Sequence, residues 1–150
     1  MVGASVSACA SLSVYSGCFC CKTIQTFSGV QNGYILRRGE LVMARKRVCG
    51  ERDLQEGRLK AFDVDGRQIV LYREGGKIYA FDRWCTHEQG DLAAGSIEEG
   101  VVTCPDHGSQ FDLENQGVNV LGPDGEEAGS VPDLPVFKVS VVDGDVFVDL

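Results

Sequence analysis

The chain has 150 residues, of which 43% are hydrophobic, so it can bury the core of one domain and is too short for two large ones. No apolar run approaches the roughly eighteen residues that a transmembrane helix needs, so we expect a protein without a membrane anchor. The formal net charge is −8, and Met43 onward carries 11 basic and 21 acidic residues. This balance argues against nucleic acid and anionic membranes as partners and suits docking to basic patches on other proteins.

Residues 1–42 differ in composition from the rest of the chain. They hold a single acidic residue, Glu40, and four of the seven cysteines, and they show no sustained helical or strand period. We expect a disordered extension without a chemical role, followed by a domain over residues 43–150. We prefer Met43 as the natural start of a cytoplasmic protein. An organellar transit peptide is the alternative, whereas a secretory signal lacks a Lys or Arg before its apolar stretch.

Short antiparallel strands with tight turns are indicated in the middle of the chain. Residues 59–64 and 67–73 flank Asp65-Gly66, and Asp-Gly between apolar alternations is a strong signal for a two-residue hairpin turn. Gly75-Gly76 then separates the second run from residues 77–81. We therefore expect three consecutive strands in this region.

A second Asp-Gly hairpin is predicted at the end of the chain. Residues 136–142 and 145–150 flank Asp143-Gly144. Four valines supply β-branched positions for a buried face, namely Val139, Val141, Val146 and Val148. Since no segment shows a convincing helical stripe, the pattern predicts an all-β sandwich or small barrel.

Cysteine and histidine occur together in two short segments. Cys85 and His87 form C-x-H, Cys104 and His107 form C-x-x-H, and the chain has no other histidine. Thiolates and neutral imidazoles bind soft or borderline transition metals, so these four side chains predict a metal site. Zinc is one candidate, although zinc sites of this composition usually pair like with like, as C-x2-4-C followed by H-x3-5-H.

The flanks of these segments resemble the Rieske family, whose second loop reads C-P-x-H-G-x-x-F/Y. Here that loop is C-P-D-H-G-S-Q-F, residues 104–111. The resemblance implies one [2Fe-2S] cluster, with Cys85 and Cys104 on one iron and His87 and His107 on the other. It also implies a Rieske-like antiparallel β-sandwich or barrel with a small inserted cluster-binding lobe, here about residues 84–112.

Four residues beside these ligands are candidates for tuning the cluster. We expect Trp84 to shield one side of it, with a place in the hydrophobic core as an equal alternative. Gly108 lets the backbone curl close to the cluster. Ser109 matches a serine whose hydroxyl donates to a cluster sulfur in high-potential family members. Asp106 places a carboxylate in the second loop, next to the predicted cluster, and its negative charge disfavours adding an electron to that cluster.

Departures from those high-potential members point to a lower potential. Their loops each carry an additional cysteine, and the two form a disulfide; the matching positions here are Gly90 and Asp106. Their tyrosine hydroxyl donor is matched by Phe111, which has no hydroxyl. We therefore predict no disulfide between the loops and a potential toward the lower end of the Rieske range of roughly −150 to +300 mV.

The segment from Leu121 to Ser130 is rich in Gly, Pro and acidic residues, so we expect a surface loop. Family members use the loop at this position to cover the cluster, and Gly122-Pro123 is the candidate for that here. We prefer the simpler interpretation, a solvated insertion.

The sequence favours a carrier over a complete enzyme, because it has no phosphate-binding loop, no nucleophile elbow and no further histidine to act as a base. From Val48 to Leu150 it resembles small Rieske ferredoxins. The implied partners are a flavin-dependent reductase and a terminal oxygenase or reductase. The alternatives are the small subunit of an NADH-dependent nitrite reductase and a zinc-stabilised interaction module.

Overall fold

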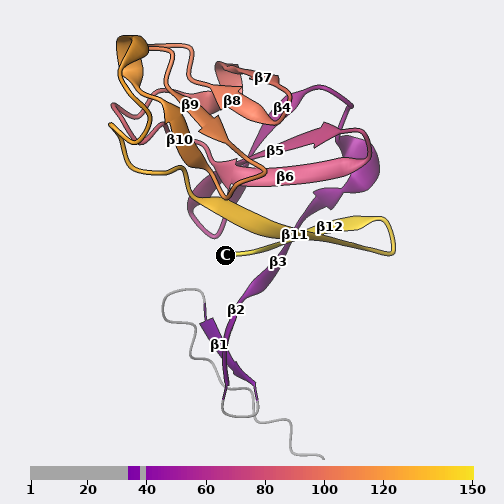
Figure 1. Ribbon diagram of the computed structural model, residues 1–150. Coiled ribbons are helices and arrows are strands. Elements are labelled where there is room, and N and C mark those ends of the chain that lie inside the picture. Colours follow the sequence, from indigo (N-terminus) through magenta and orange to yellow (C-terminus); the bar gives the residue numbers. More distant parts are fainter. Residues whose placement is uncertain (1–33, 38–39) are drawn as a thin grey trace, which may run out of the picture.

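The structure, a computed structural model, describes residues 34–37 and 40–150. This part of the chain forms twelve strands and three short 3₁₀ turns, and it has no α-helix (Figure 1). The elements in chain order are β1 (Tyr34–Arg37), β2 (Glu40–Met43), β3 (Arg45–Gly50), η1 (Glu51–Asp53), β4 (Leu59–Val64), β5 (Arg67–Glu74), β6 (Lys77–Asp82), η2 (Leu92–Ala94), β7 (Ser96–Glu98), β8 (Val101–Thr103), β9 (Gln110–Asp112), β10 (Val118–Leu121), η3 (Pro123–Gly125), β11 (Val136–Val142) and β12 (Asp145–Asp149).

Six strands form the base of the molecule, in the order β3-β12-β11-β6-β5-β4. All pairings in this sheet are antiparallel. Its two outer strands, β3 and β4, contact each other. The sheet therefore curls into a nearly closed barrel, which confirms the predicted all-β class.

Both predicted Asp-Gly hairpins are confirmed. Val64 pairs with Arg67 across Asp65-Gly66, and Val142 pairs with Asp145 across Asp143-Gly144. The φ angles are 55° and 83° in the first turn and 52° and 81° in the second. Positive φ at both central residues is what a type I′ turn requires, and its twist matches that of the flanking strands.

The strand β5 is buried on both faces. Ile69 and Leu71 pack inside the barrel with Val146 and Val148 of β12. Val70 and Tyr72, which point to the opposite face because side chains alternate along a strand, pack in a second core together with Cys85, Cys104 and Phe111. This second core joins the barrel to the lobe that carries the predicted metal ligands.

The prediction that four valines line a buried face is confirmed for two of them. Val146 and Val148 are fully buried, but Val141 is 45% exposed and Val139 is only partly buried. The reason is that β11 pairs with β6 only at Val136 and Phe137. Beyond these residues β11 separates from β6, so its later side chains are not covered on that side.

The inserted lobe is a four-stranded antiparallel sheet in the order β10-β9-β8-β7. Figure 1 shows it lying over β5 and β6. The sheet runs from Ser96 to Leu121, so it continues past the predicted end of the lobe at residue 112.

The strands β1 and β2 form a separate hairpin within the extension that we predicted to be disordered. The prediction did not include this hairpin, which lies away from the lobe in Figure 1. Residues 1–33 and 38–39 of that extension lie outside the described residues. No helix in the described part of the chain is long and apolar enough to cross a membrane.

Candidate metal centre

Two loops with the same backbone turn carry the four predicted ligands. In the first, the Cys85 carbonyl accepts a hydrogen bond from the Gln89 amide (3.0 Å), and the Cys85 amide donates to the Gly90 carbonyl (2.9 Å). In the second, Cys104 makes the same two bonds, from the Gly108 amide (3.1 Å) and to the Ser109 carbonyl (2.9 Å). The two cysteines are thus held in equivalent positions at the start of each loop.

The thiols lie at the inner end of the site and the imidazoles at its outer end. Cys85 and Cys104 are 1% and 3% exposed, whereas the His87 and His107 side chains are 27% and 38% exposed. The ring centroids of the two histidines are 5.0 Å apart, and their planes are nearly perpendicular at 84°. The structure therefore brings together all four residues that the sequence singled out.

The surroundings of the thiols fit a cationic centre. Burial is the largest cause that raises the pKa of the Cys85 thiol, and the neighbouring Cys104 raises it further, while a hydrogen bond from the His87 backbone and the nearby Ser109 hydroxyl lower it. Burial thus favours the protonated form of the Cys85 thiol, but a bound metal ion deprotonates its coordinating thiols. The donor set is thus suited to iron bound by thiolate.

Ser109 supplies a second sign that the residues fit a cluster. Its side chain is fully buried, and its Oγ has no hydrogen-bond partner among the described residues, although it lies near the Cys85 thiol. A buried hydroxyl without a partner costs free energy. The hydroxyl is available to donate to a sulfur, as the resemblance implies.

The two loops meet where Gly90 faces Asp106. A Cβ atom added to Gly90 would lie 2.5 Å from Asp106 Oδ2 and 2.8 Å from Cys104 Sγ. These are the two positions that match the disulfide of high-potential members. The described cysteines, Cys49, Cys85 and Cys104, are all free.

The two remaining candidates for tuning the cluster lie in different surroundings. Trp84 is 36% exposed, and the Arg83 guanidinium lies 4.9 Å from its ring centroid. This places Trp84 at the surface, and its shielding of a cluster stays a prediction. Gly108 has a φ of 75°, which glycine adopts with little cost.

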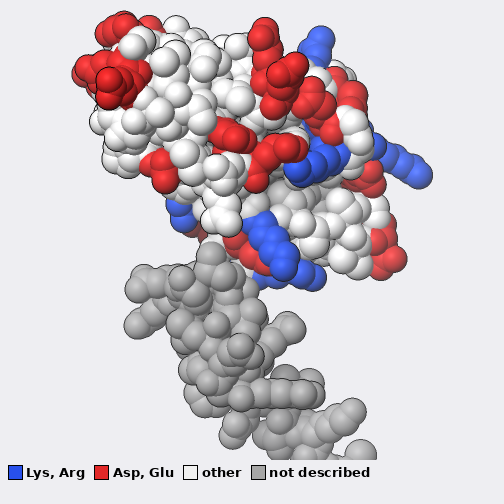
Figure 2. Space-filling view, viewed as in Figure 1, with Lys and Arg blue, Asp and Glu red and all other residues white. Residues whose placement is uncertain are grey.

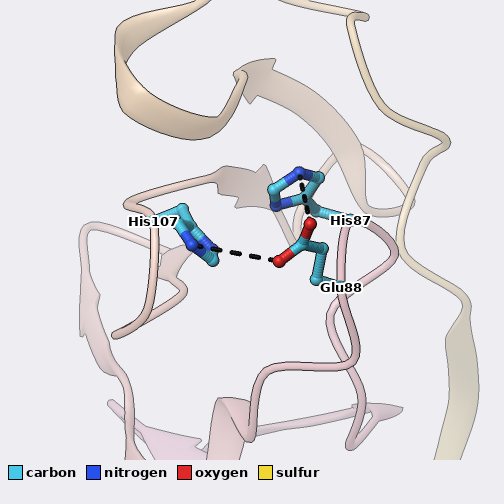
Figure 3. Close-up of side chains that lie close together, drawn as sticks. All are labelled: His87, Glu88 and His107. Atoms are coloured by element: carbon cyan, nitrogen blue, oxygen red, sulfur yellow. Dashed lines mark ion pairs between the residues drawn. The ribbon is translucent and has the colours of Figure 1, made fainter.

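Sequence reasoning missed Glu88, which lies between the two histidines (Figure 3). Its Oε1 is 3.9 Å from His87 Nε2, and its Oε2 is 4.0 Å from His107 Nε2. These distances are too long for hydrogen bonds, so the contact is electrostatic. Its position next to His87 was the available signal, but the proximity to His107 depends on the fold.

The segment after β10 also contacts both loops. The Asp124 amide donates to the His107 carbonyl (2.7 Å), and the Thr86 hydroxyl donates to the Pro132 carbonyl (2.6 Å). Gly122 and Pro123 are buried, whereas residues 124–130 are exposed. The preferred interpretation as a purely solvated insertion was therefore wrong for Gly122-Pro123.

Comparison with known proteins identifies the family. Residues 44–138 match the family model described as the Rieske [2Fe-2S] domain. The chain belongs to this Rieske family. Among its relatives, ferredoxin CarAc of Metapseudomonas resinovorans is 32% identical over 103 residues, which are 68% of this chain and 90% of the relative. The ferredoxin component of biphenyl 2,3-dioxygenase from Rhodococcus jostii is 30% identical over 108 residues, 72% of this chain and 94% of the relative.

A solved structure of a Rieske ferredoxin system has the same fold. The complex of reduced oxygenase and oxidised ferredoxin in carbazole 1,9a-dioxygenase contains a chain that is 29% identical to this one, with a TM-score of 0.59. The match covers 70% of this chain and 92% of that one. Together with the family match, these relatives establish a one-electron carrier that holds one [2Fe-2S] cluster and is not itself a catalyst. They do not favour the zinc module or the nitrite reductase subunit.

Proposed function

We propose that Cys85 and Cys104 bind one iron of the cluster and that His87 and His107 bind the other. The observation that carries this assignment is the pair of equivalent loops, which bring two buried thiols and two partly exposed imidazoles to one place. A bound [2Fe-2S] cluster supplies a centre that gains and loses one electron.

The burial of the residues around the site determines at which end an electron can enter or leave it. The thiol end is enclosed by the second core, including Phe111 and Leu92, which are fully buried. The two imidazoles are the part of the site that reaches the surface. In the described part of the chain, the histidine end is therefore the side of the site that a partner protein can approach.

The ligand assignment is tested by substitution of individual cysteines. We expect Cys85→Ser and Cys104→Ser to lose iron, acid-labile sulfide and the EPR signal of the reduced protein. Cys49→Ser is the matched control, because Cys49 is also buried and free but lies in the core of the barrel. The parent protein should show pulsed-EPR couplings to two histidine nitrogens. Full cluster content in Cys85→Ser would contradict the assignment.

We further propose that the carrier receives electrons from a flavin-dependent reductase and passes them to a terminal oxygenase. The support is the nature of the relatives, one of which was solved in complex with its oxygenase.

The charge distribution of the chain supports a further part of this proposal, namely that the partner surfaces are basic. From Trp84 to Pro135 the chain has 11 acidic residues and no Lys or Arg, whereas residues 44–83 and 136–150 have 10 acidic and 11 basic residues. In Figure 2 acidic side chains gather at the end of the lobe where η3 lies. Such a field orients the carrier with its histidine end toward a cationic surface.

Stopped-flow measurements with a purified reductase and oxygenase test this docking. The rate of electron transfer should fall as ionic strength rises. The double substitution Glu126→Gln and Glu127→Gln at the lobe end should lower the rate at low salt and flatten its salt dependence. The control is Glu74→Gln with Asp143→Asn, which removes the same charge from the barrel. An equal effect of both pairs would reject oriented docking.

We also propose that residues 43–150 are the electron-transfer unit. The family match begins at residue 44, which supports this boundary. A chain that starts at Met43 should keep the cluster content and reduction potential of the full chain. Loss of the cluster on this truncation would show that the preceding residues are needed.

A further inference from the structure

Asn119 on β10 is one of two buried polar or charged residues among those whose burial is described, and it is 1% exposed. Its Nδ2 donates to the Gln110 carbonyl (3.0 Å) and to the Leu121 carbonyl (2.7 Å), and its Oδ1 accepts from the Gly129 amide (2.8 Å). Its backbone amide donates to Asp133 Oδ1 (3.0 Å). Every polar group of the side chain is therefore used.

An irregularity in the lobe sheet explains why an amide is needed here. Asn119 pairs with Phe111 and Leu121 pairs with Gln110, so the register shifts between Asn119 and Leu121. The intervening Val120 is 38% exposed. At such a bulge the regular ladder of backbone hydrogen bonds is interrupted, and the Asn119 side chain supplies partners for two carbonyls beside it.

The hydrogen bonds of Asn119 fix both ends of one surface segment. We call residues 122–132 the strap. Leu121 precedes it, Gly129 lies within it, and Asp133 follows it, and each is bonded to Asn119. The strap in turn holds one loop of the site at each of its ends: the Asp124 amide bonds to the His107 carbonyl, and the Pro132 carbonyl accepts from the Thr86 hydroxyl.

We infer that Asn119 is a positioning residue for both histidines, acting through the strap; the inference rests on the proposed ligand roles of His87 and His107. Removing the amide takes one hydrogen-bond partner each from the Gln110 and Leu121 carbonyls and the Gly129 amide, so the strap is held less firmly against the lobe. Both histidine loops then lose the part of their outer support that depends on the Asn119 side chain, while the bond from the backbone amide of Asn119 to Asp133 remains. The spread of imidazole orientations widens, and the reduction potential shifts.

The experiment compares four variants of the full chain. Asn119→Leu removes the amide at similar volume, and Thr86→Val removes only the hydroxyl that bonds Pro132. Thr86→Ser keeps that hydroxyl and serves as the rescue. Leu113→Ala is the structural control, because Leu113 is buried in the lobe core but takes part in none of the hydrogen bonds described for the strap.

Three quantities are measured: hydrogen exchange of the Asp124 amide, the histidine nitrogen couplings of the reduced cluster and the midpoint potential. In Asn119→Leu the Asp124 amide should exchange roughly tenfold faster, because its bond to His107 opens more often. The couplings of both histidines should broaden, and the potential should shift. Thr86→Val should alter the His87 couplings, and Thr86→Ser should restore them. Leu113→Ala should lower the unfolding temperature with the couplings unchanged.

Two results would overturn the inference. One is an Asn119→Leu protein whose histidine couplings and midpoint potential equal those of the parent protein. The other is a Leu113→Ala protein whose couplings and potential change as much as those of Asn119→Leu. If Asn119→Leu does not fold, unchanged couplings in Thr86→Val reject the inference instead. If the proposed ligand set is wrong, the parent protein itself shows no histidine couplings. In that case the hydrogen exchange of the Asp124 amide still measures whether the Asn119 side chain holds the strap.

Discussion

Gln89 and Gly108 occupy the same place in the two loops of the site. Each follows its cysteine by four residues, donates its amide to that cysteine's carbonyl and has a left-handed backbone, with φ of 63° at Gln89 and 75° at Gly108. Glycine adopts this conformation freely, whereas a side chain in it costs about 1–2 kcal/mol. One loop thus carries backbone strain that the other avoids.

This difference predicts opposite effects of two substitutions. Gly108→Ala should lower the free energy of unfolding by about 1–2 kcal/mol, although nothing lies within 4 Å of the added Cβ. Gln89→Gly should leave the free energy of unfolding unchanged or raise it by up to about 1 kcal/mol. Urea unfolding measures both. A stability loss in Gln89→Gly larger than that in Gly108→Ala would show that the Gln89 side chain has a role of its own.

Gly90 is needed for a steric reason instead. In Gly90→Ala the new Cβ would lie 2.8 Å from Cys104 Sγ, and inserting a group into such a packed place costs about 1–3 kcal/mol. Asp106 can rotate away, but a bound cysteine cannot. We expect Gly90→Ala to contain much less iron and acid-labile sulfide than Gly108→Ala. The double variant with Asp106→Ala should not recover the cluster, because the contact with Cys104 remains.

Sequence alone predicted the parts of this protein that depend on local signals. The Asp-Gly turns fix both barrel hairpins, because the turn type depends on two adjacent residues. Cys85, His87, Cys104 and His107 could be singled out as candidate ligands because metal ligands are few in kind and both histidines of the chain lie in the pattern, and their role as ligands stays a prediction.

The missed features depend on contacts between distant segments. The lobe strands β7, β8 and β9 have three residues each, too few to show a period. Glu88 reaches His107 only because the two loops face each other. From the sequence alone Asn119 would be expected to be exposed, like most polar residues. Its burial follows from the bulge in β10 and from the strap packed over it.

The Arg83–Asp91 pair predicts a pH dependence of stability beside the first loop. Arg83 Nε lies 2.9 Å from Asp91 Oδ1 and Nη2 lies 2.5 Å from Oδ2, and these bonds lower the pKa of Asp91. A lowered folded-state pKa stabilises the fold above the unfolded pKa near 3.8, and this contribution is lost as the pH falls through the folded pKa.

Asp91→Asn should therefore lower the free energy of unfolding by about 1 kcal/mol, since both side chains are about a third exposed and screening limits the pair. The loss should stay constant from pH 8 to about pH 5 and narrow as the pH falls below about 4. Urea unfolding followed by the fluorescence of Trp84, the only tryptophan, measures it. A loss that grows toward acid pH would contradict the sign argued here.

Glu88 places one negative charge beside both imidazoles, which predicts its effect on the reduction potential. Adding an electron to the cluster is disfavoured by a carboxylate whose oxygens lie 3.9 and 4.0 Å from the two histidine nitrogens. Glu88→Gln keeps the shape and removes the charge, so the midpoint potential should rise. The side chain is 66% exposed, so water and salt screen it, and we expect a rise of roughly 10–40 mV that shrinks at high ionic strength.

The control for Glu88→Gln is Asp143→Asn, which removes a charge from the β11–β12 turn of the barrel. Protein-film voltammetry of both variants at two salt concentrations separates the local effect of Glu88 from that of net charge. Net charge alone predicts equal shifts, whereas proximity to the histidines predicts a shift in Glu88→Gln and almost none in Asp143→Asn. A lower potential in Glu88→Gln would mean that the carboxylate acts by another route, such as holding a partner side chain against the imidazoles.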